Sequence, residues 1–189
     1  DFFKDDGSEE SAGWVKRIHI WGKALPQKKV MALCGCVLPP NGKPCERQTV
    51  MTPFKNKIKY SSSHPSHFCN EGRLNSKDGW CAGSRTLTEW MQMDSGEVQS
   101  IAGVVIQGRR RHHQWVKTFK VEVSDDGKEW LAVECGREFD GSKDRNSKVR
   151  VLFQKPVRAR FVRINPQTWH SWPTMRAGIL LCERPCLQA

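Results

Sequence analysis

Two stretches in the middle of the chain carry the patterns of β-strands. Residues 101–106 are continuously apolar, as in a strand that is covered on both faces. Residues 118–123 alternate polar and apolar side chains, which is the period of a half-buried strand. The Asp-Asp-Gly triplet at 125–127 predicts a chain reversal, because glycine tolerates positive φ. The loop at 107–114 is therefore expected to lie between two rigid strands, where binding surfaces are often built.

The rest of the chain also consists of short strand patterns and predicts an all-β fold. Short strand patterns are separated by Gly, Pro, Asn and Asp, and no amphipathic helix pattern interrupts them, as is typical of a β-sandwich. A chain of 189 residues forms one domain with or without an appendage. No apolar run approaches the roughly 20 residues that a membrane-spanning helix needs. The start has no apolar signal segment, so we expect a mature or excised fragment.

The loop at 107–114 is also the most basic segment. Arg109, Arg110 and Arg111 are consecutive, and His112 and His113 follow them. Adjacent guanidinium groups repel one another unless an anion or an acidic neighbour compensates, and arginine suits bidentate contact with sulfate, phosphate or carboxylate. The histidines add charge as the pH falls towards about 6.5. The alternative is that Arg109 is structural and that the other side chains are solvated.

Charge restricts the class of partner without naming one. The net charge is +11, although the first ten residues hold five acidic side chains and one lysine. The remainder should attract anions such as sulfated glycan, nucleic acid, anionic lipid or acidic protein. Much of the charge at Lys148, Arg150, Lys155 and Arg158 is expected to be solvated strand face.

Eight cysteines favour an oxidising compartment and hence disulfides. Zinc is the alternative, with Cys34 and Cys36 beside Cys45, or with His64 and His67 as ligands. The C-x-C spacing and the proline between the two histidines both disfavour it. Neither Asp-Asp-Gly triplet has the spaced oxygen donors of a calcium loop, so we expect no metal and no cofactor.

Several segments together resemble one family. Residues 103–109 read G-V-x-x-Q-G-R, and residues 115–130 read W-V-x-x-F-x-V-x-x-S-D-D-G-x-x-W. Further matching segments fall in the same order, at residues 61–63, 72–75, 80, 89–94, 139–141, 159–166, 169, 175–176 and 180–182. Each segment is weak alone, but their order and spacing are specific. The chain resembles a discoidin (F5/8 type C) domain over roughly residues 45–182.

The resemblance implies a jelly-roll β-sandwich or barrel at 45–182, with an N-terminal extension at 1–44 and a tail at 183–189. It implies that Cys45 and Cys182 close the domain, which would stabilise it by about 5 kcal/mol in the chain-entropy model. Cys69 with Cys81 is the preferred local pair. Cys186 with Cys34 or Cys36 would fasten the tail to the extension, and Cys135 is expected to form a disulfide whose partner stays open. A disulfide-linked oligomer through the outer cysteines is the alternative.

The extension itself matches nothing in the resemblance. Residues 14–21 alternate in a passable strand pattern. Residues 25–44 contain four prolines and are expected to form an ordered loop pinned by Cys34 and Cys36. Arg160, Arg163 and Arg176 fall on framework positions of the family, where they would hydrogen-bond and pack.

Family members bind through loops at one end of the barrel, which here would be residues 63–68, 77–85 and 109–114. Candidate contacts besides the basic loop are His67, Phe68, Asn70, Glu71, Lys77 and Trp80, although core packing is the stronger expectation for Trp80. The first and third loops look polar, which lowers the expectation of membrane insertion.

The expected function is therefore non-catalytic, secreted or cell-surface binding in adhesion. The ligand would be an acidic glycan or a glycoprotein in a lectin-like mode. Anionic phospholipid such as phosphatidylserine and docking to a cell-surface protein are the alternatives. Nucleic acid fits the charge but not an extracellular fold. The chain has no hydrolase elbow, phosphate loop or metalloprotease helix, so we expect no enzyme.

Overall fold

The computed structural model describes residues 45–65 and 69–183, together with the backbone of five short strands within 1–44. These are β1 (Glu9–Glu10), β2 (Trp14–Val15), β3 (His19–Ile20), β4 (Lys23–Ala24) and β5 (Cys36–Val37). β2 pairs with β1, whereas β3 pairs with β4. The single strand expected over residues 14–21 is thus wrong, because two short strands with different partners occupy its ends.

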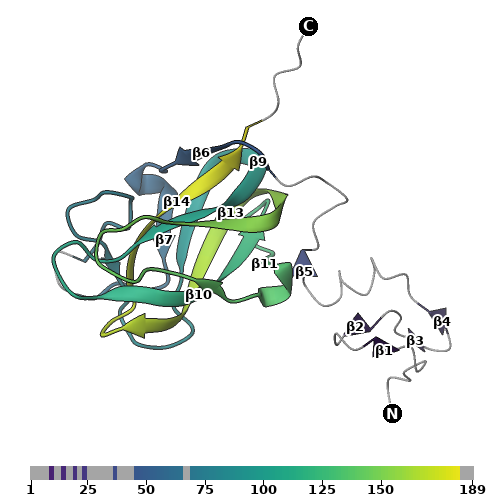
Figure 1. Ribbon diagram of the computed structural model, residues 1–189, viewed down its shortest axis with the longest axis horizontal. Helices are drawn as coiled ribbons and strands as arrows, with labels where there is room; N and C mark the ends of the chain where they lie inside the picture. Colours follow the sequence, from purple (N-terminus) through teal and green to yellow (C-terminus); the bar gives the residue numbers. More distant parts are fainter. Residues whose placement is uncertain are drawn as a thin grey trace, which may run out of the picture.

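The remaining elements form the body of the molecule (Figure 1). They are β6 (Gln48–Met51), the 3-10 helix η1 (Lys55–Lys57), β7 (Ile58–Tyr60), β8 (Trp80–Cys81), β9 (Met91–Gln107), β10 (Trp115–Ser124), β11 (Leu131–Val133), the 3-10 helix η2 (Glu134–Gly136), β12 (Phe139–Asp140), β13 (Val149–His170) and β14 (Thr174–Cys182). The hydrogen-bonded order is β5-β11-β10-β13-β9-β14-β6. The expected all-β fold is confirmed.

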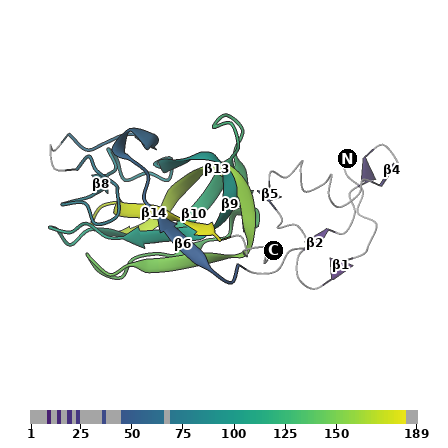
Figure 2. The same cartoon turned by 90° about the horizontal axis from the view of Figure 1, so that it is seen from above.

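The two longest strands run through both layers of a sandwich. The first half of β13, at 149–152, pairs antiparallel with the second half of β9, whereas residues 161–164 pair with β9 at 91–94. Register shifts between these stretches bend both strands, as β-bulges do. One layer therefore contains β6 and β14, and the other contains β7 and β10. Figure 2 shows the sheet curled around its interior, as in the expected jelly roll.

Burial follows the patterns read from the sequence. Every residue of β9 from Ile101 to Gln107 is buried, as expected for a strand covered on both faces. In β10, Phe119, Val121 and Val123 are buried and alternate with partly exposed neighbours. Gly127 has φ 76°, so the turn at 125–127 uses the conformation that only glycine adopts without strain. All three expectations are confirmed.

Two disulfides join described residues. Cys45 and Cys182, 137 positions apart, link β14 to the segment before β6, and Cys69 is joined to Cys81. Both pairings confirm the expectation and remove Cys45 as a zinc ligand. Cys135 is also disulfide-bonded. Cys34, Cys186 and the side chain of Cys36 lie outside the described residues, although β5 pairs in parallel with β11 beside Cys135.

The framework arginines act as the resemblance implied. Arg160 donates from Nε and Nη2 to the two oxygens of Asp94, at 2.8 and 3.0 Å. The guanidinium carbon of Arg163 lies 4.1 Å from the ring centre of Trp90 and 3.7 Å from that of Trp130. Cation–π stacking on two indoles fixes Arg163 across the outer face of the sheet. Both side chains are therefore structural.

Candidate functional site

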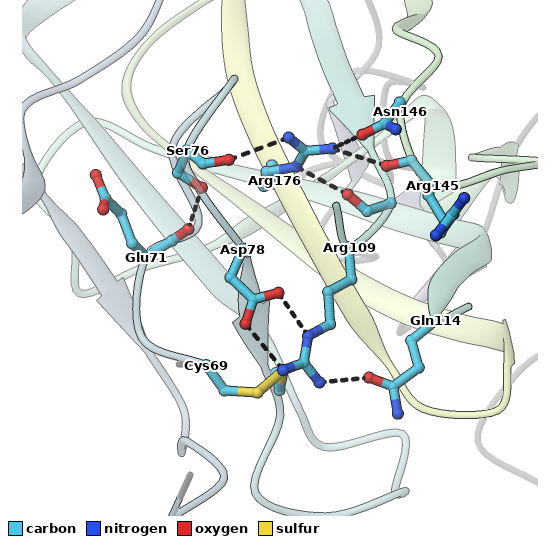
Figure 3. Close-up of polar contacts among 11 residues, drawn as sticks. Cys69, Glu71, Ser76, Asp78, Arg109, Gln114, Arg145, Asn146 and Arg176 are labelled. Carbon is cyan, nitrogen blue, oxygen red and sulfur yellow. Dashed lines mark hydrogen bonds and ion pairs between the residues drawn. A yellow bond between two sulfur atoms is a disulfide. The ribbon is translucent and has the colours of Figure 1, made fainter. Parts of the chain in front are cut away.

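A buried ion pair joins the second and third loops. Arg109 donates from Nε to Asp78 Oδ1 at 2.7 Å and from Nη2 to Oδ2 at 2.8 Å (Figure 3). Its Nη1 donates to Gln114 Oε1 at 2.7 Å. Both side chains of the pair are only 9% exposed. A bidentate pair of this kind fixes orientation as well as charge. Arg109 therefore has a structural role in place of the predicted contact with an anionic ligand.

Backbone hydrogen bonds complete the same junction. Arg109 N–H donates to the Gln114 carbonyl at 2.9 Å, which closes the basic loop on itself. Arg110 N–H donates to the Asp78 carbonyl at 3.1 Å. The backbone of the basic loop is therefore fixed at residues 109–110 and 114. The side chains of the residues between them extend from an ordered backbone.

Arg176, on β14, hydrogen-bonds to the backbone next to this junction. It donates to the carbonyls of Gly108, Ser76 and Arg145 at 2.8, 3.2 and 2.7 Å (Figure 3). Burial lowers the pKa of the Arg176 guanidinium, and the nearby positive charge of Arg110 lowers it further. With three loops hydrogen-bonded to one side chain, their relative positions depend on Arg176. Its expected framework role is confirmed.

Trp80 belongs to the core. Its side chain is fully buried, stacks on Tyr60 with ring centres 5.3 Å apart, and donates from Nε1 to the Ser62 carbonyl at 2.7 Å. Burial raises the pKa of the Tyr60 phenol. The indole does not reach the surface, so Trp80 as a ligand contact is wrong and the expected core packing is confirmed.

Glu89 joins the segment after β7 to the segment after β8 through hydrogen bonds. It accepts hydrogen bonds from the hydroxyls of Ser61, Ser62 and Ser84 and from the Ser84 N–H. Burial acts to raise the pKa of the Glu89 carboxyl, but these hydrogen bonds outweigh it and hold the pKa below its usual value. The hydroxyls of Ser61, Ser62 and Ser84 are thus engaged in ordering the loops.

An open pocket of about 480 Å³ lies where these loops meet. It is lined by His64, the Cys69–Cys81 disulfide, Arg109, His112, Gln114 and Trp172. Trp172 is held by a hydrogen bond from its Nε1 to the Ala82 carbonyl at 2.7 Å, and His64 meets its ring edge-on at 5.4 Å. The guanidinium carbon of Arg85 lies 5.3 Å from the centre of the same ring. The pocket thus has an aromatic wall. We call the exposed cations on the neighbouring loops, Arg85, Arg110 and Arg111, the cationic rim, although none of them is a lining residue.

The predicted contacts divide into three groups. Arg110, Arg111, His112 and His113 are exposed on the third loop, and of these His112 lines the pocket. Asn70 and Lys77 are exposed on the neighbouring loop, whereas Glu71 is partly buried there. His67 and Phe68 lie outside the described residues. Within 45–65 and 69–183, no cluster of three or more metal-ligating side chains occurs.

Sequence reasoning missed the roles of two pocket residues and the exposure of one apolar side chain. Trp172 lines the pocket and was not singled out, and His64 lines it too, although the sequence suggested it only as a zinc ligand. Leu87, 62% exposed, is an apolar residue in the polar loop that follows β8, so the loops are less polar than their first and third members suggest. A single leucine flanked by threonines was a visible signal for an exposed contact. Nothing local distinguishes Trp172 from the other tryptophans.

Comparison with known proteins identifies the domain. The family model of the F5/8 type C domain matches residues 57–179. Rat lactadherin is 37% identical over 124 residues, which is 63% of this chain and 28% of the relative. Human neuropilin-1 is 32% identical over 143 residues, which is 69% of this chain and 16% of that protein. The chain thus spans less than a third of either relative.

One solved structure shows the same fold. Discoidin II of Dictyostelium discoideum superposes with a TM-score of 0.63 at 24% identity, over 74% of this chain and 62% of that one. At this identity the likeness concerns the arrangement of strands and not the ligand.

Proposed function

Because the chain belongs to the F5/8 type C domain family, we propose that it is a non-catalytic extracellular binding module. Its function is adhesion or surface recognition. It takes an acidic glycan or glycoprotein through the loops at 63–68, 77–85 and 109–114. The domain is proposed to span residues 45–182, with residues 1–44 and 183–189 flanking it.

The observation that carries this proposal is the cationic rim beside the pocket. Asp78 compensates Arg109, but Arg110 and Arg111 are exposed and form no ion pair with any residue that the structure describes. Arg85 adds a third cation over Trp172. Guanidinium groups beside an aromatic wall suit a ring that carries a carboxylate or a sulfate.

The disulfides support an extracellular setting. Cys45–Cys182, Cys69–Cys81 and the bonded Cys135 all require an oxidising compartment to persist. Among the described residues, the structure has no helix with the length and apolarity to cross a membrane. An intermolecular bridge through Cys34, Cys36 or Cys186 remains a prediction.

The test is binding of the pure protein to a glycan array, alongside phosphatidylserine liposomes, at low and high salt. Selective binding to acidic glycans that weakens with salt is expected, because exposed charge pairs are screened. Binding to neutral glycans alone would overturn the role of the cationic rim. Binding to neither surface would point to a protein partner.

Leu87 favours one second candidate, an anionic membrane surface. Its side chain is 62% exposed, and Arg85 lies two residues before it. An apolar tip beside cations is the combination that peripheral membrane contact uses. Liposome binding without glycan binding would favour this candidate over the first.

A further inference from the structure

A second pocket, of about 380 Å³, is formed by the start of β10 and residues 140–143. It is lined by Trp115, Lys117, Asp140, Gly141, Ser142 and Lys143, together with Thr118. None of these residues lines the pocket at His64 and Trp172. The two pockets are therefore built from separate sets of side chains.

A β-bulge shapes this second pocket. Val116 pairs with Trp169 and Thr118 with Thr168, so Lys117 is the extra residue on β10. An extra residue re-aims the side chains of a strand, which is a common feature beside binding sites. Here the carbonyls of Val116 and Lys117 accept hydrogen bonds from Ser142 and Gly141 at 2.9 and 2.6 Å. The bulge thus holds the 141–143 segment against β10.

Gly141 makes that close approach possible. A Cβ atom at this position would lie 2.7 Å from the Val116 carbonyl oxygen, which no side chain tolerates without displacing backbone. The 141–143 segment can therefore lie directly against the backbone of β10.

The lining is suited to a sugar ring that carries an acid. Trp115 is partly exposed and is held by stacking on His170, with ring centres 4.2 Å apart. Ser142 is 2% exposed, and its Oγ has no hydrogen-bond partner within 45–65 and 69–183. A buried hydroxyl without a partner is costly unless a ligand or water supplies one. The pocket thus offers an aromatic surface, and Ser142 in its lining has a buried hydroxyl that is left without a partner.

The charged side chains of the second pocket favour an anionic ligand. Lys117 and Lys143 are exposed, and neither forms an ion pair among the described residues. Asp140 is the only acidic side chain of the lining, so the pocket carries a net charge of +1 from two lysines and one aspartate. Asp140 can accept hydrogen bonds from sugar hydroxyls while the lysines face a carboxylate or a sulfate.

We propose that this second pocket binds an acidic pyranose, with its ring against Trp115 and its anionic group at Lys117 and Lys143. The site is additional to the loop-end site and uses none of the residues proposed there. A glycan could occupy either site without the other.

The test is NMR titration of the Trp115 indole N–H, assigned with Trp115→Phe, and of the amides at 117 and 141–143. Three hexasaccharides are compared: hyaluronan, which has only carboxylates, keratan sulfate, which has only sulfates, and neutral maltohexaose. An acidic hexasaccharide is expected to shift these signals, and maltohexaose is not. Whichever acidic sugar binds identifies the anionic group.

Variants then separate this pocket from general charge attraction. Lys117→Glu/Lys143→Glu is expected to weaken binding by about ten-fold or more. The matched control Lys55→Glu/Lys128→Glu changes the same charge at exposed sites elsewhere and should bind like the wild type. Equal weakening in the control, or shifts confined to the loop-end pocket, would overturn the proposal.

Two further variants distinguish binding at the second pocket from binding at the loop-end site of the proposed function. Ser142→Ala retains the charges and is expected to weaken binding of the acidic sugar without lowering stability. Arg110→Ala/Arg111→Ala should leave the Trp115 shifts intact. If that variant abolishes the shifts, the second pocket is not a separate site.

Discussion

Arg109 and Asp78, 31 positions apart in sequence, form a bidentate ion pair from which water is largely excluded. The pair joins two loops of the site, and in it Asp78 neutralises the charge of the first of three consecutive arginines. Its neighbours Arg110 and Arg111 remain exposed. One buried pair therefore separates the structural cation of the loop from those that can meet a ligand.

Replacing Asp78 by Asn should lower the free energy of unfolding by about 3–5 kcal/mol, because it leaves the Arg109 charge buried without its partner. Urea unfolding measures this loss. Asp125→Asn, at an exposed turn, is the control and should stay within about 0.5 kcal/mol of the wild type. Replacing both members by apolar residues, Arg109→Met/Asp78→Leu, should recover most of the loss. A small effect of Asp78→Asn would mean that the pair is more hydrated than its burial indicates.

Replacing both Arg110 and Arg111 by Ala should weaken binding of an acidic glycan and flatten its salt dependence, since fewer charges are then screened. The free energy of unfolding should not fall, because both side chains are exposed. Isothermal titration at several salt concentrations gives the slope. Lys128→Ala/Arg158→Ala removes the same charge elsewhere and serves as the control. Unchanged affinity and slope would remove both arginines from the site.

Stability should fall on acidification through the loss of one carboxylate. Hydrogen bonds from Arg160 hold the pKa of the Asp94 carboxyl well below its ordinary value, despite burial. A carboxyl whose pKa is lower in the folded state stabilises the protein above its unfolded pKa of about 3.9, and this contribution is lost as the pH falls below that value. Melting temperatures between roughly pH 6 and pH 2 should therefore decline more steeply in the wild type than in Asp94→Asn.

Glu97→Gln, at an exposed position on the same strand, is the control and should follow the wild type. Parallel melting curves for the wild type and Asp94→Asn would show that another group governs acid unfolding.

Replacing Leu87 by Ser distinguishes the two candidate surfaces. The side chain is exposed, so stability should change by no more than about 0.5 kcal/mol. Glycan binding through the cationic rim should be unaffected. Liposome co-sedimentation is the informative measurement, because loss of an apolar contact weakens membrane binding. If glycan binding falls instead, Leu87 packs against the sugar.

Local pattern was sufficient for the strands and for the turn between them. Residues 101–106 indicated burial on both faces because they are continuously apolar. Residues 118–123 indicated one buried face by their alternation, because successive side chains of a strand point to opposite faces of the sheet. Gly127 marked its turn because few residues adopt positive φ. The disulfides Cys45–Cys182 and Cys69–Cys81 came from the family resemblance, since spacing alone leaves many pairings open.

The roles of individual site residues required the tertiary structure. The sequence by itself determined that residues 107–114 form a basic loop between strands. Only the folded chain decided that Asp78 neutralises Arg109, that Trp80 is buried, and that Trp172 lines the pocket. These outcomes depend on contacts between residues that lie 18 to 90 positions apart. The residue type fixes the charge of a side chain. Whether that charge forms an ion pair within the protein or stays exposed for a ligand depends on which distant segments pack against it.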